Sequence, residues 1–129
     1  MSLYKKIIKK LISKKLTLST AESCTGGLLS YSFIKNKNAS MIFDSGFITY
    51  SNKSKIENLK VRKSTILKFG SVSPNVAKQM TNGLFKKNKS NICIATTGIA
   101  GPGGAIKNKP IGLIYIGIRI NKKNIILKK

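Results

Sequence analysis

The sequence predicts an α/β protein, a single-domain layered fold over residues 1–129 in which helices flank a mixed β-sheet. Segments with apolar residues at intervals of three or four alternate with short apolar runs, which indicates helices interleaved with strands. The last two apolar runs are separated by only two or three residues, as in a β-hairpin. A length of 129 residues suits one compact domain, so a second domain is not expected.

The first half of the chain alternates between helical and extended segments. Residues 3–16 repeat apolar side chains at helical spacing between lysines and predict an amphipathic helix that packs one face on a sheet. Residues 16–20 are typical of a short strand that runs into a loop, and residues 28–35 predict the next helix. After a polar connection at 36–40, residues 46–50 predict a second strand.

Three helices are expected in the middle of the chain. Ser51 or Asn52 can cap a helix over residues 53–59, and a second short helix fits residues 63–69. Residues 73–87 begin with a serine followed by a proline, which is a strong helix start, and apolar residues then recur at intervals of four. This third helix is the longest of the group.

The last third of the chain is mostly extended. Residues 91–97 form an apolar run typical of a buried strand, and the run leads into a segment at 98–104 whose glycines and proline predict a structured loop. Residues 110–120 and 124–127 predict the two strands of a hairpin. Two glycines in the first of these strands are expected to weaken or bulge it.

The charge balance is extreme, with 25 Lys and Arg against 3 Asp and Glu and a formal net charge of +22. The lysines are scattered through every segment, as coding drift would produce on any solvated surface, and no nucleic-acid-binding motif accompanies them. We therefore expect no specific nucleic-acid partner. The alternative, non-specific binding driven by charge, predicts an affinity that falls steeply with salt.

Targeting signals are not evident in the sequence. No apolar stretch reaches the roughly 18–20 residues that a membrane span requires, and the first residues do not lead into a signal-peptide core. A cytoplasmic protein with no membrane partner is expected. Cys24 and Cys93 are too few for a disulfide scaffold and are expected to be reduced thiols.

The missing residue types exclude whole reaction classes. The sequence contains no histidine, and its only acidic residues are Glu22, Asp44 and Glu57. A Ser-His-Asp triad, a Cys-His pair, a zinc or two-metal site and a paired-carboxylate glycosidase are therefore all difficult to build. No metal site and no cofactor are expected. An enzyme with its own base would have to use lysine, tyrosine or a thiolate.

Two loops that follow predicted strands have the composition of ligand sites. Residues 23–27 offer hydroxyls, a thiol and glycine amides just before a helix, which suits an anion or an oxyanion. The alternative is a capped helix start whose glycines only form the turn. Residues 97–104 either wrap a phosphate or turn the chain, and they match neither a Walker A motif nor a dinucleotide fingerprint.

Three motifs occur in order along the chain and together resemble one known family. They are Thr20-Ala-Glu-Ser-Cys-Thr-Gly-Gly27, Gly46-Phe-Ile-Thr-Tyr-Ser-Asn52 with Lys55 after it, and Thr97-Gly-Ile-Ala-Gly-Pro-Gly-Gly104 with Lys109-Pro-Ile-Gly-Leu113. The sequence is similar to the CinA C-terminal domain, the nicotinamide-nucleotide amidohydrolase family, over about residues 3–120. This resemblance implies a nucleotide substrate, nicotinamide mononucleotide, whose carboxamide is hydrolysed to nicotinate mononucleotide and ammonia without a metal.

The resemblance also implies roles for individual residues. A hydroxyl nucleophile would work with Lys55, and Ser23 is the first choice for that nucleophile, with Ser40 as the rival. Tyr50 would orient the lysine or stack on the ligand. Contacts to the substrate are expected from the following residues: Thr25, Gly26, Gly27, Thr97, Gly98 and Gly101.

Alternatives remain open for several of these residues. Lys55 can act as a base only when neutral, so its pKa must fall from about 10.4 to roughly 7–8 through burial, a helix N-terminus and neighbouring cations; otherwise it is an ordinary solvated lysine. Cys24 is either a second candidate nucleophile or a structural thiol. Glu22 is expected to hold the loop or to form an ion pair with Lys55.

The sequence departs from the family pattern near its end, where the family continues into a C-terminal helix with a basic residue. Without that helix, one face of the sheet would be exposed, and a homodimer that covers it or a reduced activity is expected. A second hypothesis is therefore a family relic that binds a nucleotide or a partner without turnover.

Overall fold

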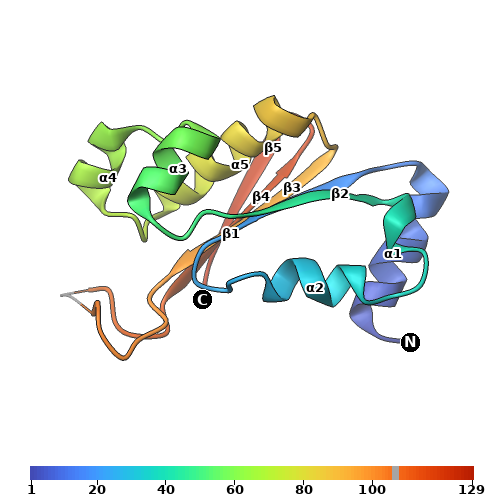
Figure 1. Cartoon of the computed structure of the whole chain (residues 1–129), viewed down its shortest axis with the longest axis horizontal. Coiled ribbons are helices and arrows are strands. Elements are labelled where there is room, and N and C mark those ends of the chain that lie inside the picture. The colour runs from blue at the N-terminus through green and yellow to red at the C-terminus, as the bar shows by residue number, and fades with distance from the viewer. Residues whose placement is uncertain (106–107) are drawn as a thin grey trace.

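The computed structural model describes residues 1–105 and 108–129. This part of the chain contains five α-helices, a short 3₁₀ helix and one five-stranded sheet, with helices on both faces of the sheet (Figure 1). In chain order the elements are α1 (Leu3–Lys14), β1 (Leu18–Glu22), α2 (Leu28–Ile34), η1 (Ala39–Met41), β2 (Phe43–Ile48), α3 (Asn52–Leu59), α4 (Lys63–Phe69), α5 (Pro74–Asn88), β3 (Ile92–Gly98), β4 (Ile114–Ile120) and β5 (Lys123–Lys128).

The sheet is mixed, as the sequence predicts. Its strand order is β2-β1-β3-β4-β5. The first three strands are parallel, and β4 and β5 run antiparallel to β3 and to each other. Glu22 on β1 is in register with Ile48 on β2 and with Thr96 on β3, so the carboxyl ends of these three strands lie side by side. Loops that follow them must meet at this edge of the sheet.

Two apolar clusters hold the layers together. On one face, α3 and α5 pack over Ala21 and Ala95 of the central strands, and α5 contributes Val76, Met80 and Leu84. On the other face, residues of α1 and α2 pack against the alternate side chains of the same strands, and the two helices lie together there (Figure 1). Since side chains alternate along a strand, each central-strand position is assigned to one face or the other.

Two glycines allow the longest helix to approach its neighbours closely. A Cβ on Gly117 in β4 would lie 2.8 Å from the carbonyl oxygen of Ala77, and a Cβ on Gly83 would lie 1.8 Å from that of Leu59 in α3. Helix α5 therefore packs tightly on both β4 and α3. The expected bulge in β4 is absent, because its pairing with β3 runs without interruption from Gly98 to Ile92.

Most predicted elements are confirmed, but three strands have limits that differ from the predicted ranges by more than one residue. Strand β1 extends through Ala21 and Glu22, which the sequence pattern placed in the loop. Strand β2 spans Phe43–Ile48 rather than residues 46–50. Strand β4 begins at Ile114 rather than at residue 110, because residues 110–113 form a turn in which Gly112 has a φ of +92°.

Candidate active site

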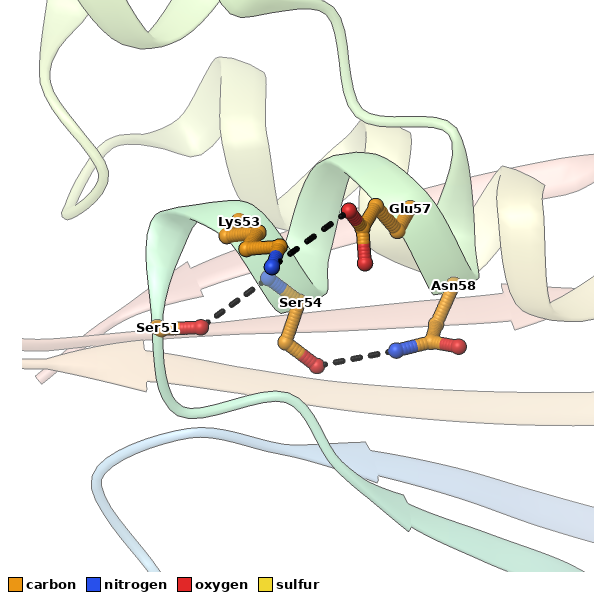
Figure 2. Close-up of polar contacts among 5 residues, drawn as sticks. All are labelled: Ser51, Lys53, Ser54, Glu57 and Asn58. Carbon is orange, nitrogen blue, oxygen red and sulfur yellow. Dashed lines mark hydrogen bonds and ion pairs between the residues drawn. The ribbon is translucent and has the colours of Figure 1, made fainter.

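Helix α3 presents a polar face to solvent and Lys55 to the interior. Ser51 caps the helix by accepting a hydrogen bond from the Ser54 amide at 3.0 Å. Lys53 and Glu57 form an exposed ion pair at 4.0 Å on the outer face (Figure 2). Lys55 and Leu59, which are four residues apart, lie on the opposite face and are both buried. The cap and the amphipathic pattern together direct the Lys55 side chain into the protein.

The buried ammonium of Lys55 has two partners among the described residues. Its Nζ lies 3.0 Å from the Ser23 Oγ and 3.1 Å from the Tyr50 carbonyl oxygen, and it donates to both. Lys55 is 2% exposed and Ser23 is 6% exposed. The structure therefore brings together a serine and a lysine that the sequence separates by a strand and a helix.

Burial lowers the pKa of Lys55 below its ordinary value of 10.5, while the nearby Cys24 thiol acts in the opposite direction. Neighbouring cations, which were also expected to lower this pKa, are not among its causes. The segments that form the Ser23 side of the site, residues 16–34 and 38–52, contain no Lys or Arg. Loss of solvation on burial is thus what makes Lys55 easier to deprotonate.

Ser23 lies directly after β1, on the face of the sheet that α3 and α5 cover. Ala21, two residues earlier, belongs to the cluster on that face, and alternation places Ser23 on the same side. The Ser23 amide donates to the Thr96 carbonyl oxygen at 3.1 Å, which continues the pairing of β1 with β3. The backbone around the hydroxyl is therefore fixed by the sheet rather than by a free loop.

Glu22 points to the opposite face and has a different role from the expected ion pair. Its carboxylate accepts hydrogen bonds from the Thr25 hydroxyl at 2.6 Å, the Leu29 amide at 2.9 Å, and the Ser30 amide and hydroxyl at 2.9 and 2.5 Å. Burial alone would raise the pKa of Glu22, but these bonds outweigh burial and lower it. Glu22 holds the loop and the first turn of α2, as the alternative prediction had it.

An open cavity of about 340 Å³ lies beside the Ser23–Lys55 pair. Tyr50 and Cys24, which flank the pair, line it, and Tyr50 is 74% exposed. The predicted substrate contacts Gly98 and Gly101 also line it. The remaining lining residues are Gly70, Ser71, Val72, Ile99, Ala100, Gly103, Gly104 and Lys109.

Four predicted substrate contacts do not line this cavity. The Thr25 hydroxyl is bonded to Glu22 and to Thr96, and the Gly26 amide donates to the Ser23 carbonyl oxygen at 3.1 Å. Gly27 is the N-cap of α2, with a φ of +106°. The buried hydroxyl of Thr97 donates to the Ser71 carbonyl oxygen at 2.8 Å. Their polar groups shape the loops around the cavity instead of facing into it.

The rival serine, Ser40, is not brought to Lys55. It is exposed in η1, before β2 begins, whereas Lys55 follows the far end of the same strand. Ser40 lines a separate cavity of about 500 Å³, together with Asp44 and Gly46. Strand β2 separates the two sites along its length.

Sequence reasoning assigned no role to several residues of the site. Thr96 accepts or donates a hydrogen bond with Thr25 at 2.8 Å, and residues 70–72 form one wall of the cavity. These residues carry no local motif, so only the folded chain shows them. Lys109 was part of a motif, and its position in a glycine-rich context was the available signal.

Within residues 1–105 and 108–129, no group of three or more Cys, Asp or Glu side chains lies close enough together to hold a metal ion. In the same part of the chain, no helix has the length and apolar character needed to cross a membrane.

The family model described as the CinA C-terminal domain matches residues 1–129. The chain belongs to this family. Among CinA relatives, it is 49% identical over 122 residues to a putative competence-damage inducible protein of Clostridioides difficile (strain 630) and 50% identical over 125 residues to one of Clostridium botulinum (strain Langeland). These alignments cover 95% and 97% of this chain but only 29% and 31% of the relatives, so the chain spans less than a third of their length.

Solved structures of CinA proteins share the fold. The competence/damage inducible protein CihA of Agrobacterium tumefaciens superposes with a TM-score of 0.94 at 36% identity, over 99% of this chain and 83% of that one. A CinA superfamily protein of Escherichia coli gives a TM-score of 0.94 at 29% identity, over 98% and 74% of the two chains. The arrangement of helices and strands is therefore that of the family throughout.

Proposed function

We propose that this CinA domain hydrolyses the carboxamide of nicotinamide mononucleotide to nicotinate mononucleotide and ammonia. The family includes amidohydrolases, and the three motifs on which the resemblance to the nicotinamide-nucleotide enzymes rests lie around one end of the sheet. The observation that carries the proposal is the buried pair of Ser23 and Lys55, with 3.0 Å between Oγ and Nζ.

Ser23 and Lys55 fit a nucleophile and its general base. A serine hydroxyl is a weak nucleophile until a neighbouring base accepts its proton. A neutral lysine amine offers one lone pair, and at 3.0 Å the Ser23 hydroxyl can donate to it. Burial favours the neutral amine by lowering the pKa of Lys55. The Tyr50 carbonyl at 3.1 Å accepts one N–H and orients the amine.

In the first half of the proposed reaction, Lys55 takes the Ser23 proton as Oγ attacks the carboxamide carbon. The C–O bond forms and the carbonyl becomes an oxyanion. The protonated Lys55 then gives its proton to the amide nitrogen, the C–N bond breaks, and ammonia leaves. The product is a nicotinoyl ester on Ser23.

In the second half, neutral Lys55 takes a proton from water, whose oxygen attacks the ester carbon. The Ser23 oxygen departs and recovers its proton from Lys55. Nicotinate mononucleotide is released, and both residues return to their starting states. No metal and no cofactor takes part in either half, which accords with a sequence that has no histidine and three acidic residues.

The cavity offers a position for the pyridine ring. Tyr50 lines the wall next to the Ser23–Lys55 pair and presents a largely exposed aromatic ring. An offset stack of two aromatic rings is a favourable arrangement. We assign Tyr50 two roles in this proposal: its carbonyl orients Lys55, and its ring contacts the substrate.

A second function, nucleotide binding without turnover, is favoured by one observation. Ser23 is 6% exposed and does not itself line the cavity, although its neighbour Cys24 does. A ligand confined to the cavity would therefore contact Cys24 and Tyr50 rather than the Ser23 hydroxyl. A domain that binds the nucleotide in this way would form no product.

The test is ammonia release from nicotinamide mononucleotide by the purified chain and by three variants, Ser23→Ala, Lys55→Ala and Ser40→Ala. We expect the first two to lose at least about a thousandfold in kcat/KM, as loss of a nucleophile or its base does. The Ser40→Ala variant should retain nearly wild-type activity. If Ser40→Ala lost activity and Ser23→Ala kept it, the nucleophile would be Ser40 instead of Ser23. Saturable binding without ammonia would support the second function.

A further inference from the structure

A second polar cavity, of about 330 Å³, lies between α3 and α5 and shares no lining residue with the cavity beside Ser23. Helices α3 and α4 both pack on α5, and the connection between them forms one wall of this cavity, which we call the α3–α5 groove (Figure 1). Four of its nine described lining residues are cations, namely Lys60, Arg62, Lys78 and Lys86. None of the three acidic residues of the chain lines it, so both of its walls are positively charged.

These four cations have no counter-charge in the described part of the chain. Among residues 1–105 and 108–129, none of their side chains takes part in an ion pair or a hydrogen bond. The acid closest to them in sequence, Glu57, is paired with Lys53 at 4.0 Å (Figure 2). Cations gathered around a concave site repel one another and raise the local concentration of anions. An anion in the α3–α5 groove would relieve this repulsion.

A side chain of the groove itself holds the α3–α4 connection to α5. Gln79, half-buried on α5, accepts a hydrogen bond from the Arg62 amide at 2.9 Å and donates to the Thr65 hydroxyl at 2.8 Å. Lys60 is the C-cap of α3, with a φ of +59°, and its amide donates to the Ile56 carbonyl oxygen at 3.1 Å. The backbone that carries Lys60 and Arg62 is therefore fixed, although both side chains are exposed.

Asn82, also on α5, supplies an unused hydrogen-bond donor. Its Oδ1 accepts from the Arg119 guanidinium at 2.8 Å and from the Asn124 side-chain nitrogen at 3.1 Å. Since an arginine side chain can only donate, the oxygen of Asn82 must lie on the Arg119 side. The Nδ2 of Asn82 has no acceptor among the described residues. Two N–H groups of a half-buried, oriented amide are therefore left for a ligand.

The shape of the groove favours an elongated anion with several charges. Lys78, Asn82 and Lys86 recur at intervals of four along α5, so they lie on one face of the helix and span about 12 Å. Lys60 and Arg62 belong to the other wall. Ammonium, guanidinium and amide donors all suit phosphate oxygens. None of the described lining residues is aromatic, so the groove lacks the stacking platforms on which single-stranded nucleic acids bind.

We infer that the α3–α5 groove is a binding site for a small polyphosphate anion. Its four cations neutralise the charge of the anion, and the Asn82 amide donates to the phosphate oxygens. This inference goes beyond the proposed function and does not depend on it, because neither Ser23 nor Lys55 lines the groove. Inorganic tripolyphosphate has the chain form and the charge that the groove requires, and it is the probe for the test.

Calorimetry measures the binding of tripolyphosphate to the whole chain at about 0.15 M ionic strength, where exposed charges are screened beyond roughly 8 Å. We expect saturable binding at one site. Arg62→Ala/Lys78→Ala should weaken this binding by at least about tenfold, because two charge-assisted contacts are lost. The matched control, Lys122→Ala/Lys123→Ala, removes the same charge from exposed lysines at the start of β5 and should change the affinity by less than about twofold.

A second variant tests the groove without removing a cation. Asn82→Asp keeps an oxygen for Arg119 and Asn124 but replaces the free donor with a negative charge. It should also weaken the binding of tripolyphosphate by at least about tenfold. Its control is Asn58→Asp, which places the same charge on the exposed surface of α3 and should change the affinity little.

Each outcome decides the inference. Equal affinities of a groove variant and its control would mean that tripolyphosphate responds only to net charge, and would overturn the site. Wild type that shows no saturable binding would overturn it too. If a single-stranded oligonucleotide bound through Arg62 and Lys78 more tightly than tripolyphosphate, the groove would be a nucleic-acid site instead. Ammonia release from nicotinamide mononucleotide is measured separately, so failure of the proposed function leaves this result unchanged.

Discussion

The Nζ of Lys55 lies 3.0 Å from the Oγ of Ser23, although 32 positions separate the two residues in the sequence. The bond joins the first turns of α3 to the end of β1, and both side chains are buried. Its effects on activity and on stability can be measured separately. The proposed activity depends on a neutral Lys55 amine, whereas the stability depends on the free energy of burying the charged form.

Activity should rise with pH through the pKa of Lys55. In the proposed reaction only a neutral Lys55 amine can accept the Ser23 proton, and burial sets the pKa of Lys55 below 10.5. The pH profile of kcat/KM should therefore climb and level off before pH 10.5. Lys55→Arg, whose guanidinium stays protonated, should lose at least about a hundredfold at every pH. A profile that falls over the same range would contradict a lysine base.

Lys55→Met should reveal the stability cost of the buried amine. Because the folded pKa lies below 10.5, folding disfavours the protonated lysine; this cost is full below the folded pKa and vanishes above 10.5. We expect the Tm of Lys55→Met at pH 7 to equal or exceed that of wild type. Wild type should gain relative to the variant as the pH rises toward 10.5. The measurement is thermal unfolding by circular dichroism at several pH values.

Glu22→Gln should destabilise the fold by about 1–3 kcal/mol at pH 7, because a buried carboxylate with four donors becomes an amide with fewer acceptor sites. The pKa of Glu22 is lowered, so its contribution is present above pH 4.5 and is lost as the pH falls through the folded pKa. The matched control is Glu57→Gln, which removes an exposed, weakly paired carboxylate and should change little. Equal effects of the two substitutions in urea unfolding would refute a special role for Glu22.

Gly83→Ala should cost at least about 2 kcal/mol of unfolding free energy, because its methyl group would lie 1.8 Å from the Leu59 carbonyl oxygen and the backbone there has little freedom to move. Gly103→Ala is the control for stability, since nothing lies within 4 Å of a Cβ at that position. Denaturant titration compares the two variants. If Gly83→Ala left the free energy of unfolding unchanged, α3 and α5 would pack less closely than the structure shows.

Cys24→Ala should retain activity within about an order of magnitude of wild type. Burial raises the pKa of the Cys24 thiol, although its own backbone and Lys55 act in the opposite direction. The thiol is therefore predominantly protonated near neutral pH and is a weak nucleophile. A loss as large as that of Ser23→Ala would transfer the nucleophile to Cys24.

The order of the elements follows from local pattern, and so do the bounds of α4 and the cap at Ser51, because periodicity and capping depend on neighbouring residues. The limits of the strands depend on residues that are distant in the sequence. Ala21 and Glu22 belong to β1 because β2 and β3 pair with them, which no short window shows. The role of the Glu22 side chain likewise depends on which face of the sheet α2 covers.

The site was predicted in part. The pairing of Ser23 with Lys55 was implied by the resemblance to the family, and the structure has their Oγ and Nζ atoms 3.0 Å apart. Ser40 was the rival because of the resemblance to the family. In the structure it lies before β2 and Lys55 lies after it, so the strand holds the two residues at its opposite ends. The cavity wall at residues 70–72 depends on how α4 and α5 meet the sheet, which is a non-local property.

The close contact at Gly83 also bears on how the site meets its ligand. The Leu59 carbonyl oxygen lies where a Cβ at position 83 would be placed. Leu59 in turn lies one helical turn after Lys55 in α3. The amine is thus preorganised: the entropy of ordering its flexible side chain is lost when the chain folds, not when a ligand arrives. Binding in the cavity then requires little reordering of the Lys55 side chain. If α3 and α5 packed less closely, part of that entropy would be lost at each binding event instead of during folding.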